Sequence, residues 1–252
     1  MMLCLLSSTC VLGGILFNDS YLPFSLVALR DSYSFILSNF FVSYLSTVIA
    51  CSGGILGITE ETSKTEQYLV VSKPFDVLVP HSLTQLVIAW SIPMHTWLRR
   101  FVFRPIHSKM GPFVAILATY LASALLHGVN AQIAVVLLTV GFFTYIEYNF
   151  RARLAKVFDA CVGSRPCEDT SAGVCHHKYD LDHPVVRCVN VSFSFYAAVL
   201  FAYSTACFGE DSEHGDQTTG YSLQHLLYTW SKLNWFGHAI SLLTFLFNRF
   251  SS

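Results

Sequence analysis

The chain has 252 residues, of which 53% are hydrophobic, 15% aromatic and only 12% charged, and its formal net charge at pH 7 is -1. A soluble domain carries roughly 25% charged residues, so this composition excludes an ordinary soluble protein and favours a polytopic membrane protein. The balanced charge provides no basic surface for nucleic acid, and we expect no nucleic-acid partner.

Five apolar stretches approach the roughly 20 residues with which a helix spans a bilayer. We expect an all-α, polytopic protein with spans at 2–17, 35–58, 111–126, 131–148 and 185–207, and a shorter apolar segment at 235–247. The first stretch has neither a charged region before it nor a small-residue cleavage site after it, which favours a transmembrane helix over a signal peptide. An alternative is that the chain starts in the middle of a longer protein.

The segment 81–103 mixes polar residues and proline with Trp90 and Trp97. That composition predicts an interfacial, re-entrant or protein-buried segment rather than a lipid-facing span. If one helix continues through it, the two indoles share a face. The other interpretation is that they are interfacial anchors.

Basic residues gather in two segments, 99–109 and 151–156, which flank the apolar stretches at 111–126 and 131–148. The positive-inside rule predicts that both segments are cytosolic and that the turn at 128–130 faces the lumen. Glu147 and Arg151 are spaced i, i+4 near the second basic segment, and we expect a plain interfacial ion pair.

His127 closes the apolar stretch at 111–126. A histidine at membrane depth costs free energy and usually faces an interior cavity, where an imidazole can act as an acid or a base. A histidine that only forms hydrogen bonds at the end of a helix is an equally good interpretation. Ser123 lies one turn earlier on the same face, and more often such a serine marks close helix packing than a nucleophile.

Three cysteines, Cys161, Cys167 and Cys175, precede His176 and His177 in the loop after 151–156. Their spacing matches no common zinc pattern, so we expect no bound metal. In a cytosolic loop we expect these thiols to be reduced. One of them is a candidate for S-acylation, because the loop follows a membrane helix directly.

Four sequence words carry a family resemblance: VSKPFDVLVP at 71–80, WSIPMHTWLRRFVF at 90–103, SALLHG at 123–128 and TYIEYNFRARLAKVFDACV at 144–162. In combination and order they resemble the membrane-bound O-acyltransferases, and the resemblance runs from about residue 32 to the C-terminus. The nearest branch is the one that acylates Wnt proteins in the endoplasmic reticulum membrane.

The resemblance implies one membrane-embedded acyltransferase domain over 1–252, an MBOAT-like helical bundle that lacks the N-terminal helices of the full family. It implies that His127 is the catalytic base, that palmitoleoyl-CoA is the donor and that a Wnt serine is the acceptor. No bound cofactor is implied beyond this co-substrate. Ser91 stands where the family usually carries Asn or Asp, so we take it as a second site residue and expect weakened catalysis.

Two rival functions come from other classes. A catalytically impaired homologue would bind Wnt or lipid without acylating it, which Ser91 and the short length favour. A transporter or channel would place several charges inside the membrane, and the apolar stretches contain essentially one histidine.

Overall fold

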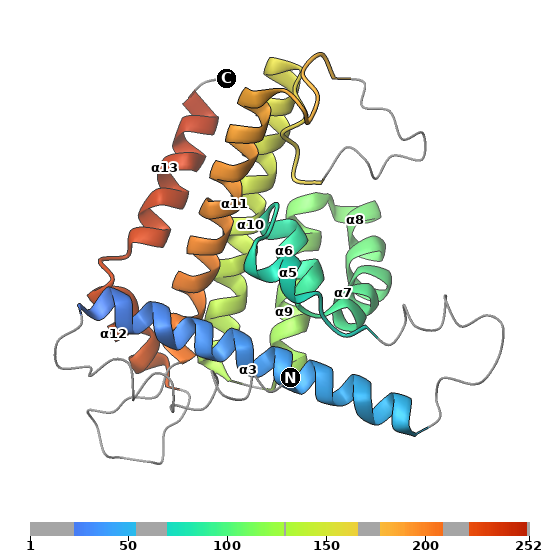
Figure 1. Cartoon of the computed structure of the whole chain (residues 1–252), viewed down its shortest axis with the longest axis vertical. Helices are drawn as coiled ribbons and strands as arrows, with labels where there is room; N and C mark the ends of the chain where they lie inside the picture. The colour runs from blue at the N-terminus through green and yellow to red at the C-terminus, as the bar shows by residue number, and fades with distance from the viewer. Residues whose placement is uncertain (1–22, 54–69, 129, 166–176, 209–221, 251–252) are drawn as a thin grey trace.

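The computed structural model describes residues 23–53, 70–128, 130–165, 177–208 and 222–250 (Figure 1). Throughout these residues the secondary structure is helical, with no strand and one isolated bridge between Ala160 and Tyr179. The predicted all-α class is therefore confirmed. The predicted span at 2–17 lies outside the described residues.

Three of the described helices are long and apolar enough to cross a membrane: α3 (Phe24–Ser52), α10 (Ala131–Phe158) and α11 (Pro184–Thr205), which continues through a 3-10 turn to Phe208. Helix α3 begins at 24, directly after Pro23, rather than at the predicted 35, and it therefore includes Arg30 and Asp31, whose side chains pair at 2.9 Å. Figure 1 shows α10 and α11 side by side, with α3 crossing them near their lower ends.

The middle of the chain is a run of short helices. They are α5 (Pro74–Leu78), α6 (Leu83–Trp90), α7 (Ile92–Leu98), a π-helix (Arg99–Phe103) and α8 (Arg104–Met110). Segment 81–103 is thus broken, at Ser91, whose backbone is extended just before Pro93. Because the helix does not persist, Trp90 packs against the core while Trp97 is exposed, and the two indoles do not share a face.

Helices α9 (Pro112–Leu126) and α10 form the hairpin that the apolar stretches predicted. They approach closely at Gly141, where an added Cβ would lie only 2.7 Å from the ring of Tyr120. The chain ends with α12 (Leu223–Lys232) and α13 (Phe236–Phe250), so the last apolar segment is helical from 236 rather than 235.

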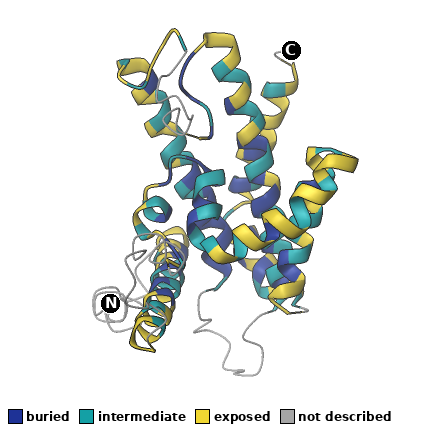
Figure 2. Ribbon diagram, turned by 90° about the vertical axis from the view of Figure 1, so that its right-hand side faces the viewer, coloured by how far each residue is buried: buried dark blue, intermediate teal, exposed yellow. Residues whose placement is uncertain are grey.

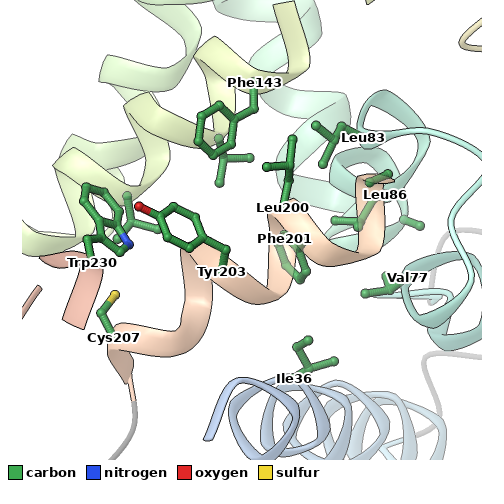
Figure 3. Close-up of a cluster of buried hydrophobic side chains, with 14 of the residues drawn as sticks. Ile36, Val77, Leu83, Leu86, Phe143, Leu200, Phe201, Tyr203, Cys207 and Trp230 are labelled. Atoms are coloured by element: carbon green, nitrogen blue, oxygen red, sulfur yellow. The ribbon is translucent and has the colours of Figure 1, made fainter. Parts of the chain in front are cut away.

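The main apolar core lies where α3, α6, α10, α11 and α12 meet (Figure 3). Phe143, Leu200, Tyr203 and Trp230 are nearly inaccessible within it. Many residues outside this core are exposed (Figure 2), and numerous large apolar side chains on α3, α9 and α13 are among them, as expected for helices that face lipid.

Candidate active site at the end of α9

His127 is the first residue beyond α9, and backbone hydrogen bonds hold it there. Its amide donates to the carbonyl of Ser123 at 3.1 Å, and Gly128 follows with a φ of 93°. The side chain of Asn130 then caps α10 by accepting from the amides of Gln132 and Ile133. The glycine and the cap together end one helix and start the next, and they hold the imidazole at the tip of the hairpin.

The His127 side chain is exposed and makes no hydrogen bond to any of the described residues. Leu125 and Leu126, directly before it, are 63% and 52% exposed. The imidazole therefore stands beside open apolar surface with its nitrogens available. Ser123 is buried, and its place within α9 fits a packing serine rather than a nucleophile.

Ser91 lies between α6 and α7 in an extended conformation and is half-buried. Its carbonyl accepts from the amide of His95 at 2.9 Å, but its hydroxyl caps neither helix. The neighbouring Trp90 is locked in place by aromatic contacts with Phe35, Phe40 and Phe201. Ser91 is therefore held at a fixed position with a hydroxyl that the backbone does not use.

No hydrogen bond joins Ser91 to His127 across the part of the chain that is described. Both nevertheless flank the same core. Trp90, next to Ser91, and Tyr120, which lies two helical turns before His127, pack against the main apolar cluster. Helices α7 and α9 also contact each other directly. The structure thus brings the two segments to one core without bringing the two side chains into contact.

A buried polar network holds α10 against α6, and composition alone did not reveal it. Glu147 and Arg151 form a salt bridge at 3.5 Å with both side chains fully inaccessible. The carboxylate accepts from the amide of Leu83 at 2.7 Å, and Arg151 donates to the carbonyl of His81 at 3.0 Å. The predicted interfacial pair is therefore wrong: the pair is buried because the start of α6 and the segment after α10 fold over it.

One nitrogen of Arg151, Nη2, meets three groups: Gly163 O at 2.8 Å, His81 Nε2 at 2.9 Å and Asn190 Oδ1 at 3.0 Å. Nη2 carries two hydrogens and so donates to two of these three groups, and the tautomer of His81 decides whether its Nε2 accepts from Arg151 or donates to Gly163 O at 3.0 Å. Burial and the adjacent charge of Arg151 lower the pKa of His81, against a smaller opposing effect of the Gly163 hydrogen bond.

Of the three cysteines in the loop after 151–156, the structure describes only Cys161, and its state differs from the prediction. Cys161 is disulfide-bonded, so the prediction of a reduced thiol is wrong for this residue. Its partner is not among the described cysteines, since Cys51, Cys188 and Cys207 are free. Cys167, Cys175 and His176 lie outside the described residues, and no metal-binding group of side chains occurs in the part of the chain that is described.

Comparisons with known proteins agree with this arrangement. A family model described as "MBOAT, membrane-bound O-acyltransferase family" matches residues 19–160, which include both Ser91 and His127. The chain belongs to the membrane-bound O-acyltransferase family. The match covers α3 through α10, and so includes the hairpin tip and, of the buried network, His81, Glu147 and Arg151.

Curated proteins similar to this chain are named protein-serine O-palmitoleoyltransferase porcupine. The human protein is 36% identical over 98% of this chain and 56% of its own length. The Anopheles gambiae protein is 32% identical over 85% of this chain and 43% of its own length, and the Drosophila melanogaster protein 30% over 97% and 48%. The chain therefore spans about half the length of the curated relatives it matches.

Proposed function

We propose that this protein is a protein-serine O-palmitoleoyltransferase of the endoplasmic reticulum membrane that acylates Wnt proteins. The observation that supports this most is the likeness of almost the whole chain to relatives that bear that name. The proposal treats 1–252 as a single membrane-embedded acyltransferase domain. Palmitoleoyl-CoA is the donor and a serine of Wnt is the acceptor.

His127 is the proposed general base. The hydroxyl of an acceptor serine is a poor nucleophile near neutral pH, and an imidazole within hydrogen-bond reach raises its reactivity. The serine oxygen forms a bond to the acyl carbon while the carbon–sulfur bond breaks. The imidazole takes the hydroxyl proton and passes it to the departing thiolate of coenzyme A, so the base is regenerated.

The surroundings of His127 suit this role. Leu121 and Leu125 are spaced i, i+4 along α9 and are 51% and 63% exposed, which gives an apolar strip that ends two residues before His127. Such a strip offers a path for a fatty chain. A thioester is already a reactive donor, so positioning and one base can supply much of the rate.

Replacement of His127 by Ala tests the proposal. Membranes from cells that express the chain would be given palmitoleoyl-CoA with an alkyne tag and a Wnt-derived serine peptide. Loss of the base should lower the rate about 100-fold or more. His107→Ala, at an exposed histidine of α8, is the matched control and should retain normal activity. Near-normal activity of His127→Ala would exclude this residue as the base.

The rival proposal is a homologue that binds Wnt or lipid without acylating it. Ser91 favours it, since a serine hydroxyl cannot reproduce the planar side chain of the Asn or Asp that the family usually carries there. The same assay separates the two proposals. Peptide binding without acyl transfer by the unaltered chain would support the rival.

A further inference from the structure

Helices α10 and α11 have a long hollow along their contact, at the end of α10 away from His127. It consists of two cavities of about 420 Å³ and 410 Å³, and Val189 lines both. The lining includes apolar side chains spaced by four residues within each helix: Phe150, Leu154 and Phe158 on α10, and Val185, Val189 and Phe193 on α11. Because side chains four apart share one face of a helix, both cavities follow one line, which we call the α10–α11 seam. Figure 1 shows the two helices side by side.

The two ends of the seam differ in chemistry. At the outer end, just beyond the second basic segment, Phe158 and Val185 are 61% and 62% exposed. At the inner end, Glu147 of α10, Tyr196 of α11 and Thr244 of α13 bring polar groups to the lining. An apolar chain is not stabilised beside such groups, so they limit how far it extends. The seam is therefore an apolar groove that opens near the predicted membrane surface and ends at polar groups within the bundle.

The length of the seam suits a fatty chain. Between Glu147 and Phe158, α10 rises about 16 Å, at ~1.5 Å per residue. An extended hydrocarbon of about 13 carbons has that length, given the spacing of carbon–carbon single bonds. The seam also starts about 25 Å along α10 from the hairpin tip. A chain bound in the seam is therefore separate from a chain that would react at His127.

The lining of the seam favours an apolar occupant over water. Protein interiors contain few voids larger than a water molecule, and water fills a cavity only where several polar groups bind it. The hydroxyl of Ser192, near the middle of the seam, is already used within α11, where it donates to the carbonyl of Cys188 at 3.0 Å. Elsewhere on α11, Val191 and Phe195 are 64% and 71% exposed, as expected for a helix that faces lipid. Lipid chains are thus the apolar molecules that reach the seam.

We propose that the α10–α11 seam binds one fatty chain of a membrane amphiphile, with the polar head of that molecule at the outer end. Polar groups for the head are present there. The rings of Tyr179 and His183, which both line the outer cavity, pack with centroids 4.9 Å apart, and the ammonium of Lys178 lies 5.4 Å from the centroid of Tyr179. A free fatty acid and a lysophospholipid each supply one such chain with an anionic group in its head.

The test is photo-crosslinking to the intact chain in bilayer discs of phosphatidylcholine. One probe is palmitic acid with a diazirine in its chain, and the other is a lysophosphatidylcholine that carries the same chain. Mass spectrometry locates the crosslinks. Excess unlabelled amphiphile should suppress labelling of Leu154, Val189 and Phe193 about tenfold, because one site saturates. Labelling of exposed residues on α3, such as Val42 and Ile49, reports the surrounding lipid and should change far less.

Val189→Trp places an indole where the two cavities meet and should also lower labelling of the seam about tenfold. Val191→Trp, at an exposed position of the same helix, is the matched control and should leave it unchanged. The probe that labels the seam identifies the head group. If competition lowers labelling of α3 as much as that of the seam, or if both variants act alike, only surrounding lipid is bound. Should Val189→Trp not fold, the competition decides alone. No acyl transfer is measured, so the result is independent of the role of His127.

Discussion

At the scale of single residues, Ser91 is the candidate site residue whose type departs from the Asn or Asp that the family usually carries. Its hydroxyl is free of the helix caps on both sides, and Trp90 fixes its place. In the proposed enzyme, a group here polarises the thioester or orients the acyl donor. Ser91→Asn should then raise the acylation rate several-fold, because an amide reaches further and offers planar donors. Turnover of the tagged donor measures this.

Thr96→Asn is the matched control for Ser91→Asn, since Thr96 is an exposed polar residue on α7, one turn further along. It should leave turnover unchanged. If Asn at 91 lowers a rate that begins high, the alignment of this position is incorrect, and His95 becomes the candidate partner of the base. If the unaltered chain and both variants show no acylation, the non-acylating rival is favoured.

His127 was singled out by its place at the end of an apolar stretch, whereas its role as the base and the choice of Ser91 came from the family resemblance. His81 carried no such signal. Its importance comes from Arg151 and Gly163, which are distant in sequence and approach it only after α10 packs on α6. Burial of a charged pair such as Glu147 and Arg151 is likewise invisible in an i, i+4 spacing, because the same spacing describes a solvated pair.

At the scale of elements, the Glu147–Arg151 pair joins α10 to α6 and to the segment after α10. Arg151→Met should destabilise the protein by about 3–5 kcal/mol, because it leaves the carboxylate of Glu147 buried without its partner. Thermal unfolding in detergent measures the loss. The double variant Glu147→Leu with Arg151→Met should be less destabilised than the single variant, since no charge is then left unpaired. Equal destabilisation would mean that the lost hydrogen bonds dominate.

His81 makes the stability of the contact between α10 and α6 depend on pH. Its pKa is lowered in the folded chain. At mildly acidic pH, His81 is therefore protonated in the unfolded chain to a greater extent than in the folded chain. Stability is therefore full above the ordinary histidine pKa of about 6.5 and decreases as pH falls below it. Melting temperatures at about pH 7.5 and about pH 5.5 should show this decrease. His81→Gln, which cannot titrate, should reduce it, and an unchanged pH dependence would contradict the assignment.

Helix positions were predictable where the apolar signal was long and uninterrupted. The stretch at 185–207 matched α11 and its 3-10 extension within a residue at either end. Boundaries failed where polar residues continue a helix, as in α10, which runs ten residues beyond the predicted 148 and carries both Arg151 and Arg153. The break at Ser91 followed from Pro93, but the π-turn after it has no sequence signature in this chain.

At the scale of the whole molecule, the hairpin of α9 and α10 separates His127 from the basic residues at its other end (Figure 1). This separation is what an acyl transfer across a membrane requires, with the donor entering from one side and the acceptor from the other. The exposed apolar strips of α3, α9 and α13 are consistent with lipid around the bundle. Sidedness, however, depends on charges in the connecting segments, not on the packing of the helices.

We predict that segments 99–109 and 151–156 are both cytosolic and that the turn at 128–130 is luminal. The physical reason is that clustered Arg and Lys resist translocation, so they set the orientation as the helices insert. Glycosylation sequons placed one at a time in each segment report sidedness, because only luminal sequons receive a glycan. The turn at 128–130 should be modified when the sequon is set on a short polar extension, and the two basic segments should not.

The disulfide at Cys161 makes the 151–156 sequon the decisive one. Disulfides persist in the lumen and are rare in the cytosol, so this bond favours the side opposite to that favoured by the basic residues just before it. A glycan in that segment would therefore agree with the bond and reverse the orientation of the hairpin, placing His127 at the cytosolic end. Acceptor serines of a secreted protein could not then reach the imidazole. The absence of a glycan there, with one at 128–130, keeps His127 on the luminal side, where the proposed acceptor is found.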